Sequence, residues 1–210
     1  MFSGKSALTV QFYFGIGSRY SYLAATQLPR LAADTQARFE WRPLDVRTLI
    51  ERAGSDPFRP NVRRGQYDPA FRTRDGSRWA AYYGVPYREP DWERTDWRTL
   101  SLAAVAAGRL GAVEAFSMGL LEECFAQGRA PADREALARI AGDAGLDRAA
   151  FLDAVASPET AARHQHNLDD AFKAGAFGVP TFVLPNGELY WGQDRIPLLR
   201  HRLTSGESLA

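Results

Sequence analysis

Two serines, Ser18 and Ser21, follow the first apolar stretch of the chain and stand where a helical pattern begins. At the start of a helix, unpaired main-chain N–H groups and the helix dipole favour an anion, and a thiolate is such an anion. The alternative for Ser18 is an ordinary N-cap, whose hydroxyl oxygen accepts a hydrogen bond from a main-chain N–H. Ser21 is expected to be the less important of the two.

The segment Gly15-Ile16-Gly17 lies between a predicted strand and a predicted helix. A dinucleotide-binding fingerprint needs a third glycine where this chain has Tyr20. We therefore interpret the two glycines as a flexible connection between strand and helix.

Near the C-terminus, Gly178-Val179-Pro180-Thr181 enters a second strand pattern. Proline is allowed at the first residue of a strand, and a cis Val179–Pro180 bond would mark a specific backbone arrangement. Such a loop would expose the N–H and C=O of Val179 for pairing with an extended peptide. The alternative is a trans proline at the start of an edge strand.

The single cysteine, Cys124, shares an apolar helical stripe with Phe116 and Leu120, so we expect a buried structural thiol. One cysteine cannot form an intramolecular disulfide, a CxxC pair or a zinc cluster. His164 and His166 are two residues apart on a predicted helix and face different sides, so no metal site is expected.

The first 45 residues have a strand, helix, strand pattern. Residues 8–14 and 38–44 read as strands, and residues 20–33 as a helix kinked at Pro29. A helix between two strands predicts that the strands are parallel.

Helical patterns fill the middle of the chain. The prolines and arginines of residues 45–90 predict short helices and long loops. Residues 97–127 and 132–154 each predict two helices, and residues 157–174 predict another.

The pattern of residues 181–203 predicts a hairpin followed by a helix. Strands over residues 181–184 and 188–191 flank Asn186-Gly187, a strong hairpin signal. Asp194 is expected to cap a helix that runs through Leu203. The whole order predicts one discontinuous sheet domain, residues 1–45 and 158–210, with a helical domain inserted over residues 46–157.

Composition excludes several classes of protein. The chain has 210 residues, and its 26 basic and 25 acidic residues leave a net charge of +1, which disfavours a nucleic-acid partner. No stretch approaches the roughly 20 apolar residues of a membrane helix, and the N-terminus lacks the pattern of a signal peptide. We therefore expect a cytoplasmic protein with no membrane contact.

Several segments occur in an order that resembles a known family: Phe12-Tyr13-Phe14, Ser18-Arg19-Tyr20-Ser21-Tyr22-Leu23-Ala24, Arg78-Trp79-Ala80, Tyr83-Gly84-Val85-Pro86, Phe177-Gly178-Val179-Pro180-Thr181 and Trp191-Gly192-Gln193-Asp194-Arg195. Together they resemble the 2-hydroxychromene-2-carboxylate isomerase family, which is related to kappa-class glutathione transferases and DsbA thiol oxidoreductases. The resemblance covers most of the chain.

The resemblance implies an α/β, thioredoxin-like fold with an inserted all-helical subdomain, as in DsbA, and a homodimer that binds glutathione in a cleft. Ser18 stands where redox relatives carry their reactive cysteine and would bind the glutathione sulfur. Val179, before a cis Pro180, would pair with the cysteinyl backbone, and Gln193 and Asp194 would hold the γ-glutamyl end.

Further site residues also follow from the resemblance. Asn61 and Arg64 would take the places of an asparagine and a lysine that contact glutathione in the family. The substrate carries a carboxylate, for which Arg19 and Arg78 are candidates, with other arginines nearby in the sequence at Arg63, Arg72 and Arg74. Gly15 replaces a usual acidic residue and Arg19 a usual proline, and these departures concern the substrate more than the fold.

The implied activity is the cis-trans isomerisation of an aromatic-derived pyruvate through a glutathione thiolate, a step of aromatic catabolism. Two alternatives stay open. One is a kappa-like glutathione S-transferase that uses another electrophile, and the other is a cysteine-less thioredoxin-fold protein that binds an extended peptide. The absence of cysteine at positions 18 and 21 excludes a DsbA-type oxidase.

Overall fold

A four-stranded mixed sheet forms the centre of the protein in the computed structural model, which describes residues 8–54, 68–91, 95–131 and 133–205. The strands are β1 (Thr9–Phe14), β2 (Arg38–Pro43), β3 (Thr181–Val183) and β4 (Leu189–Trp191), in the order β2-β1-β3-β4. β1 runs parallel to β2 and antiparallel to β3, and β4 is antiparallel to β3. The predicted parallel pair and the predicted C-terminal hairpin are confirmed.

The alternation of side chains along β1 divides the core between the two faces of the sheet. Phe12 and Phe14 belong to one buried cluster, and Tyr13 belongs to another. The ring of Phe12 lies 5.0 Å from that of Trp41 on β2 and 5.1 Å from that of Phe182 on β3. These cross-strand aromatic contacts fix the register, because a slip of one residue would turn each ring to the opposite face.

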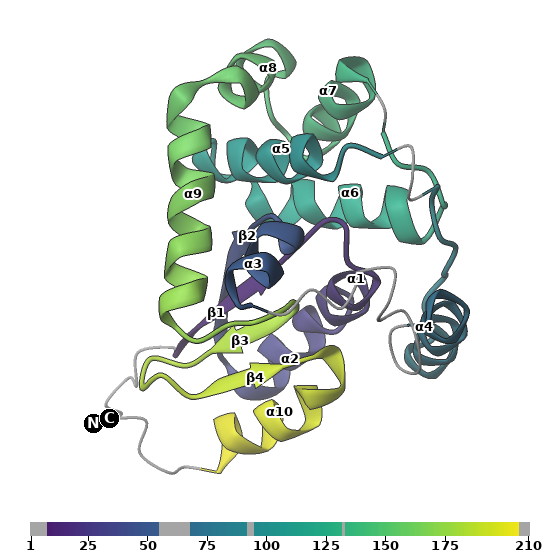
Figure 1. The fold of residues 1–210 in the computed structure, drawn as a ribbon, viewed down its shortest axis with the longest axis vertical. Helices are drawn as coiled ribbons and strands as arrows, with labels where there is room; N and C mark the ends of the chain where they lie inside the picture. The colour runs from purple at the N-terminus through teal and green to yellow at the C-terminus, as the bar shows by residue number, and fades with distance from the viewer. Residues whose placement is uncertain (1–7, 55–67, 92–94, 132, 206–210) are drawn as a thin grey trace.

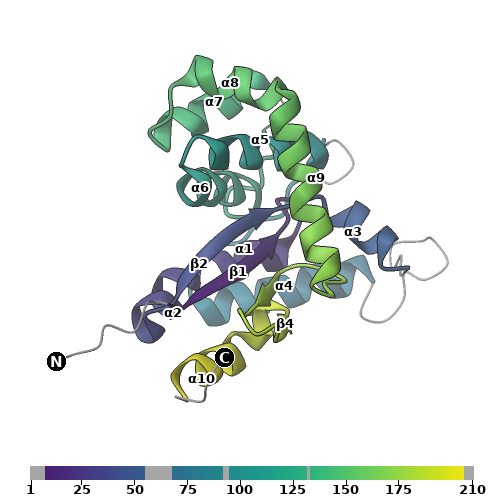
Figure 2. The same ribbon diagram turned by 90° about the vertical axis from the view of Figure 1, so that its left-hand side faces the viewer.

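Helices cover both faces of the sheet (Figures 1 and 2). The cluster of Phe12 includes residues of α1 (Arg19–Ala25), α2 (Leu28–Thr35) and α10 (Ile196–Thr204). The cluster of Tyr13 includes residues of α3 (Val46–Arg52) and α9 (Pro158–Lys173).

The single kinked helix expected over residues 20–33 is wrong, because α1 ends at Ala25 and α2 begins at Leu28. Pro29 has no N–H for a helical bond, and its ring would clash with the carbonyl of Ala25 in a continuous helix. The proline therefore lies in the first turn of a new helix.

Helices α5 to α8 stack beyond the end of the sheet in Figure 1. They are α5 (Trp97–Arg109), α6 (Val113–Phe125), α7 (Arg134–Asp143) and α8 (Arg148–Ala156). Most of their buried apolar residues belong to the cluster of Phe12. The division into two domains stays a prediction. None of the described helices is long and apolar enough to cross a membrane.

The expectation of only short helices between residues 45 and 90 is also wrong, because α4 (Pro69–Tyr83) has 15 residues. The Asp68 carboxylate caps its start by accepting a bond from the Phe71 N–H, and Pro69 needs no helical donor there. Gly84 ends the helix with a left-handed φ of 69°. These end signals outweigh the weak apolar periodicity of the segment.

Asp194 does not cap the last helix. It lies within a single 3₁₀ turn, η3 (Gln193–Arg195), and α10 begins only at Ile196, with Arg195 at its N-cap and no side-chain capping bond. The 3₁₀ turn places the Asp194 carboxylate before the helix instead of over its first N–H groups.

His164 of α9 is buried against α5, where its Nε2 lies 3.0 Å from Ser101 Oγ. Burial lowers the pKa of His164 below 6.5, and Arg98 lowers it further, while Asp45 opposes the change. His166 lies on the exposed side of the same helix, 3.0 Å from Asp170. The two histidines therefore face different sides of α9, as predicted.

We predict that His164 makes the free energy of unfolding fall as the pH drops. The unfolded imidazole binds a proton below about pH 6.5, whereas the buried one stays neutral to lower pH, so acid favours the unfolded state. In His164→Gln, urea unfolding at pH 5 and pH 7.5 should show a smaller difference in free energy than in the wild type. The exposed His201 provides a control, because His201→Gln leaves His164 intact. An unchanged difference in His164→Gln would contradict the prediction.

Candidate functional site

Ser18 is the N-cap of α1 and is 9% exposed. Its Oγ accepts a hydrogen bond of 3.2 Å from the Ser21 N–H. Within the described residues the hydroxyl proton has no acceptor. Ser18 is thus an N-cap, which was one of the two predictions for it. Its O–H group can still donate a hydrogen bond to a second partner.

The turn that carries Ser18 is stabilised by hydrogen bonds within it and by the packing of an aromatic ring against it. The Ser21 hydroxyl accepts a bond of 3.3 Å from the Gly15 N–H, and the Gly15 carbonyl accepts one of 3.1 Å from the Ser18 N–H. The indole of Trp97 packs on Gly17, since a Cβ there would lie 3.0 Å from the ring. Ser21 is completely buried, so its role is structural, whereas Ser18 reaches the surface.

The Val179–Pro180 bond is cis, as the sequence predicts. Tyr13 pairs with Thr181, so Pro180 lies beside the end of β1 and on the same edge of the sheet as the Ser18 turn. Val179 is 8% exposed. In the part of the chain that the structure describes, its main-chain N–H and C=O make no hydrogen bond, although buried main-chain groups nearly always have partners.

The Gln193-Asp194 turn is tied directly to this loop. The Gly192 N–H donates a bond of 2.9 Å to the Pro180 carbonyl, and Gly192 adopts a φ of 111°, which glycine allows. Gln193 is 5% exposed, and its side-chain amide bonds to none of the described residues. Asp194 is exposed, with Arg195 Nε at 3.7 Å. Since η3 packs against α1, both predicted residues lie close to the Ser18 helix.

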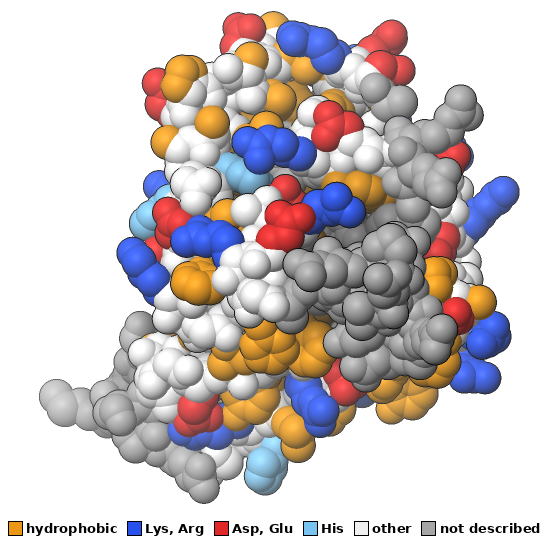
Figure 3. Space-filling view, viewed as in Figure 1, with side chains coloured by type: hydrophobic (Ala, Val, Ile, Leu, Met, Phe, Trp, Pro, Cys, Tyr) orange, Lys and Arg blue, Asp and Glu red, His pale blue; other side chains and the backbone are white. Residues whose placement is uncertain are grey.

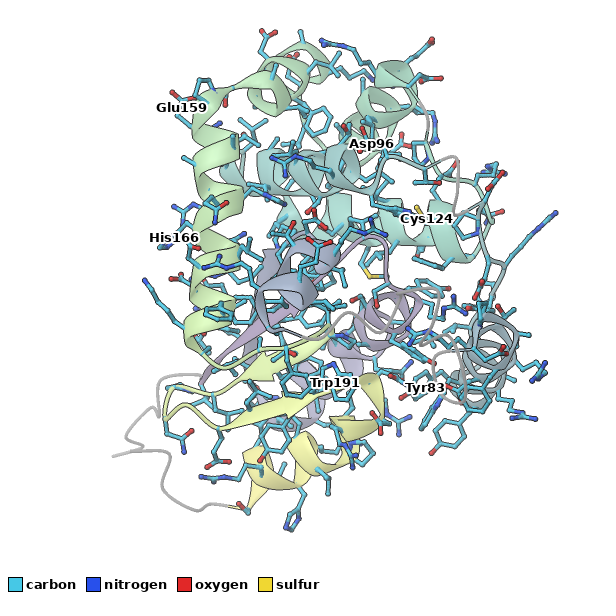
Figure 4. All side chains as sticks on the ribbon, in the orientation of Figure 1. Tyr83, Asp96, Cys124, Glu159, His166 and Trp191 are labelled. Atoms are coloured by element: carbon cyan, nitrogen blue, oxygen red, sulfur yellow. The ribbon has the colours of Figure 1, made fainter. Side chains whose placement is uncertain are left out.

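Tyr83, at the end of α4, contacts the Gln193-Asp194 turn, although no pattern in the sequence predicts this. Its hydroxyl donates a bond of 3.2 Å to the Gln193 carbonyl. Burial and the nearby Asp194 carboxylate raise the pKa of Tyr83 to about 12. Figure 4 shows Tyr83 on α4 and Trp191 on β4, on the same side of the molecule. A hydrogen bond from a side chain to a distant carbonyl depends on the fold and leaves no local pattern.

An exposed aromatic pair adjoins the cis-proline loop. Phe177 and Trp191 are each 45% exposed, and their ring centroids are 4.9 Å apart. Gly178 fits beneath the indole, because a Cβ there would lie 2.7 Å from Trp191 Nε1. Figure 3 shows hydrophobic side chains gathered over the β3–β4 hairpin.

The predicted arginines have different surroundings. Arg19 is 8% exposed and forms an ion pair with Glu89, so its charge is directed onto the segment that follows α4. Arg72 lies with its guanidinium 5.1 Å from the centroid of Tyr20, and Arg74 and Arg78 are exposed on α4. Asn61, Arg63 and Arg64 lie outside the described residues.

Cys124 is fully buried, as predicted, and burial raises the pKa of its thiol to about 12. A cavity of about 930 Å³ lies between the outer edge of β2 and the helices α5, α6 and α9. It includes none of Ser18, Val179, Gln193 and Asp194. The candidate site therefore lies where the ends of β1 and β3 meet, apart from that cavity.

The chain matches the model of the DSBA-like thioredoxin domain over residues 9–204. It is 32% identical to a 2-hydroxychromene-2-carboxylate isomerase of Sphingobium xenophagum over 93% of this chain and 97% of that protein. It belongs to this family of DSBA-like proteins. A Pseudomonas putida protein of the same name is 28% identical over 91% of this chain and 92% of its own length.

A solved structure of a 2-hydroxychromene-2-carboxylate isomerase gives a TM-score of 0.83 at 26% identity, and the match covers 94% of this chain and 95% of that one. The α/β, DSBA-like thioredoxin fold expected from the sequence is confirmed. This DSBA-like chain carries serine at both 18 and 21. At Gly15, which was expected to differ from the family, the Val46 side chain occupies the space that a Cβ would take.

We predict that Tyr83→Phe loosens the Gln193 turn. The variant removes a hydrogen bond to a main-chain carbonyl, which typically contributes about 0.5–1.5 kcal/mol to stability. Urea unfolding measures the change. The matched control is Tyr82→Phe, since Tyr82 is 78% exposed and its loss should change stability by less than about 0.5 kcal/mol. Equal stability of Tyr83→Phe and the wild type would show that this bond does not hold the turn.

Proposed function

We propose that the protein is a glutathione-dependent isomerase of the 2-hydroxychromene-2-carboxylate isomerase type, acting on an aromatic-derived pyruvate. The observation that carries the proposal is the 32% identity to an isomerase of that name over nearly the whole of both chains. The isomerase-named structure, at a TM-score of 0.83, supports the same activity.

The site residues fit glutathione. The unpaired N–H and C=O of Val179 suit an extended peptide, which would pair with them as an added strand does. The amide of Gln193 and the carboxylate of Asp194 offer a hydrogen-bonding group and a negative charge to the amino-acid end of the γ-glutamyl residue. The hydrogen bond from the Gly192 N–H to the Pro180 carbonyl connects the Val179 loop to the Gln193-Asp194 turn. Asn61 and Arg64 are proposed as further contacts from the resemblance alone.

Glutathione supplies a thiol, which in its deprotonated form can add reversibly to a conjugated double bond. The contribution of the chain is to favour that deprotonated form. The Ser18 hydroxyl has no acceptor among the described residues, so it can donate to a sulfur anion. A hydrogen bond to the charged form lowers the pKa of a thiol.

A carboxylate substrate calls for a guanidinium near the candidate site, and α4 offers exposed arginines. Arg78 is exposed on α4, the helix that ends at the Tyr83 contact with Gln193. An exposed guanidinium is able to bind a carboxylate through two parallel hydrogen bonds. We therefore propose Arg78 as a substrate-binding residue. Arg19 shares this proposal, but its existing partner Glu89 competes with a substrate anion.

We predict that the protein binds reduced glutathione and that Asp194→Ala weakens the binding. Losing a charge-assisted bond costs about 1–3 kcal/mol, so the Kd measured by calorimetric titration should rise about 5- to 150-fold. Asp153→Ala, which removes an exposed carboxylate on α8, should leave the Kd unchanged. Unchanged affinity in folded Asp194→Ala would locate the γ-glutamyl contact elsewhere, and no binding by the wild type would exclude both glutathione-dependent activities.

We predict that Ser18→Ala reduces the rate more than the binding. If the hydroxyl stabilises the thiolate, kcat at neutral pH should fall about 10- to 1000-fold, with a smaller change in the glutathione Kd. The pKa of the bound thiol, followed by thiolate absorbance, should rise.

The matched control is Ser157→Ala. Ser157 caps α9 with the same geometry, since its Oγ accepts a bond of 3.3 Å from the Thr160 N–H, compared with 3.2 Å at Ser18. Both variants should lose about 0.5–2 kcal/mol of stability as N-caps do, but only Ser18→Ala should change the thiol pKa. Equal thiol pKa values in wild type and Ser18→Ala, with a lower melting temperature, would leave Ser18 as a cap alone.

A further inference from the structure

Arg19, the residue after Ser18, is held by polar contacts to Thr73 of α4 and to Glu89, which follows that helix. Its side chain is 10% exposed and that of its ion-pair partner Glu89 is 16% exposed. Arg19 Nη1 also donates to Thr73 Oγ1 at 3.3 Å, and the Thr73 hydroxyl donates to Glu89 at 3.1 Å. A buried cation and a buried carboxylate are each costly alone, so each side chain requires the other.

The packing around this pair is tight. The Tyr87 hydroxyl donates to Glu89 Oε1, the same oxygen that faces Arg19. Gly76 lies inside α4, where a Cβ would come 3.3 Å from Arg19 Cδ and still closer to the Tyr87 hydroxyl. Glycine weakens a helix interior relative to alanine, and here it permits two side chains to approach the helix axis.

The charges of the four ionisable side chains in this cluster sum to zero. Beside Arg19 and Glu89, the Asp75 carboxylate accepts a bond of 2.8 Å from the Tyr20 hydroxyl, and the Arg72 guanidinium lies 5.1 Å from the Tyr20 ring centroid. The cluster of Arg19, Arg72, Asp75 and Glu89 thus contains two cations and two anions, with a formal sum of zero. Among the described residues, Glu122 acts on the Tyr22 hydroxyl of α1, Asp194 lies on η3, which contacts α1, and Arg74 and Arg78 are exposed on α4.

We propose that Glu89 is a positioning residue that holds the Arg19 guanidinium against Thr73 of α4 and cancels its charge beside Ser18. The inference rests on the proposed binding of glutathione near Ser18. With the pair intact, the Ser18 hydroxyl determines how readily the bound thiol loses its proton. With either partner neutralised, an uncompensated charge remains one residue from Ser18 and acts on the same thiol.

The test measures the pKa of the bound glutathione thiol by thiolate absorbance, together with the melting temperature, in three variants. Glu89→Gln leaves a net positive charge and should lower the thiol pKa; Arg19→Gln leaves a net negative charge and should raise it. The double variant restores neutrality and should return to the wild-type value. At an assumed separation of about 10 Å, a unit charge changes a pKa by about 0.3–1.2 pH units for effective dielectric constants between about 80 and 20.

Tyr20→Phe is the control for a purely structural role. It removes the bond to Asp75 across the same α1–α4 contact without changing any charge. It should lower the melting temperature and leave the thiol pKa unchanged.

Shifts of the two single variants in the same direction, or no shift in either, would overturn the inference. If Glu89→Gln does not fold, the comparison of Arg19→Gln with the double variant still decides, because the double variant must have the lower thiol pKa. Absence of glutathione binding by the wild type would overturn the proposed function and this inference together. Binding without the opposite shifts would overturn this inference alone.

Discussion

The pairing of β3 with β1 is the constraint on which the candidate site depends. Ser18 follows β1, and Val179 precedes β3, so only their antiparallel register brings these distant segments to one sheet edge. The stacked rings of Phe12 and Phe182, with centroids 5.1 Å apart, belong to the buried core and hold that register. A slip of one residue would expose an aromatic ring and move the Val179 main chain away from the Ser18 turn.

Local signals predicted the parts of the fold that local chemistry determines. Alternating aromatic and β-branched residues located β1 and β2, Asn186-Gly187 located the hairpin, and the serine before α1 proved to be its N-cap. The length of α4 was missed because its apolar periodicity is weak. Its cap, Asp68, and its end, Gly84, were both readable in the sequence, and they determine the helix better than the number of prolines around it.

Site residues were predictable from the sequence only where a short local segment indicates their role. Ser18 and the cis bond at Val179–Pro180 could be proposed from short segments. Tyr83 and Glu89 could not, because each acts on a residue far away in the chain: Gln193 for Tyr83 and Arg19 for Glu89. Asp194 shows the opposite failure, since a residue type typical of helix caps lies in a 3₁₀ turn that precedes the helix.

The surroundings of Ser18 favour a supporting role over that of a nucleophile. A serine nucleophile needs an adjacent general base, usually histidine. The three histidines of the chain lie elsewhere: His164 contacts Ser101, His166 contacts Asp170, and His201 is in the last turn of α10.

The chain's own thiol is not a suitable nucleophile either. Cys124 is the only cysteine, it is fully buried, and burial raises its pKa to about 12, so it stays protonated and out of contact with a substrate at neutral pH. Among the described residues, the candidate site presents a hydroxyl donor at Ser18, a main-chain N–H and C=O at Val179 without hydrogen-bond partners, and a polar turn at Gln193. Such groups are able to stabilise an anion on a peptide-like ligand, and the proposed glutathione thiolate is a nucleophile of that kind.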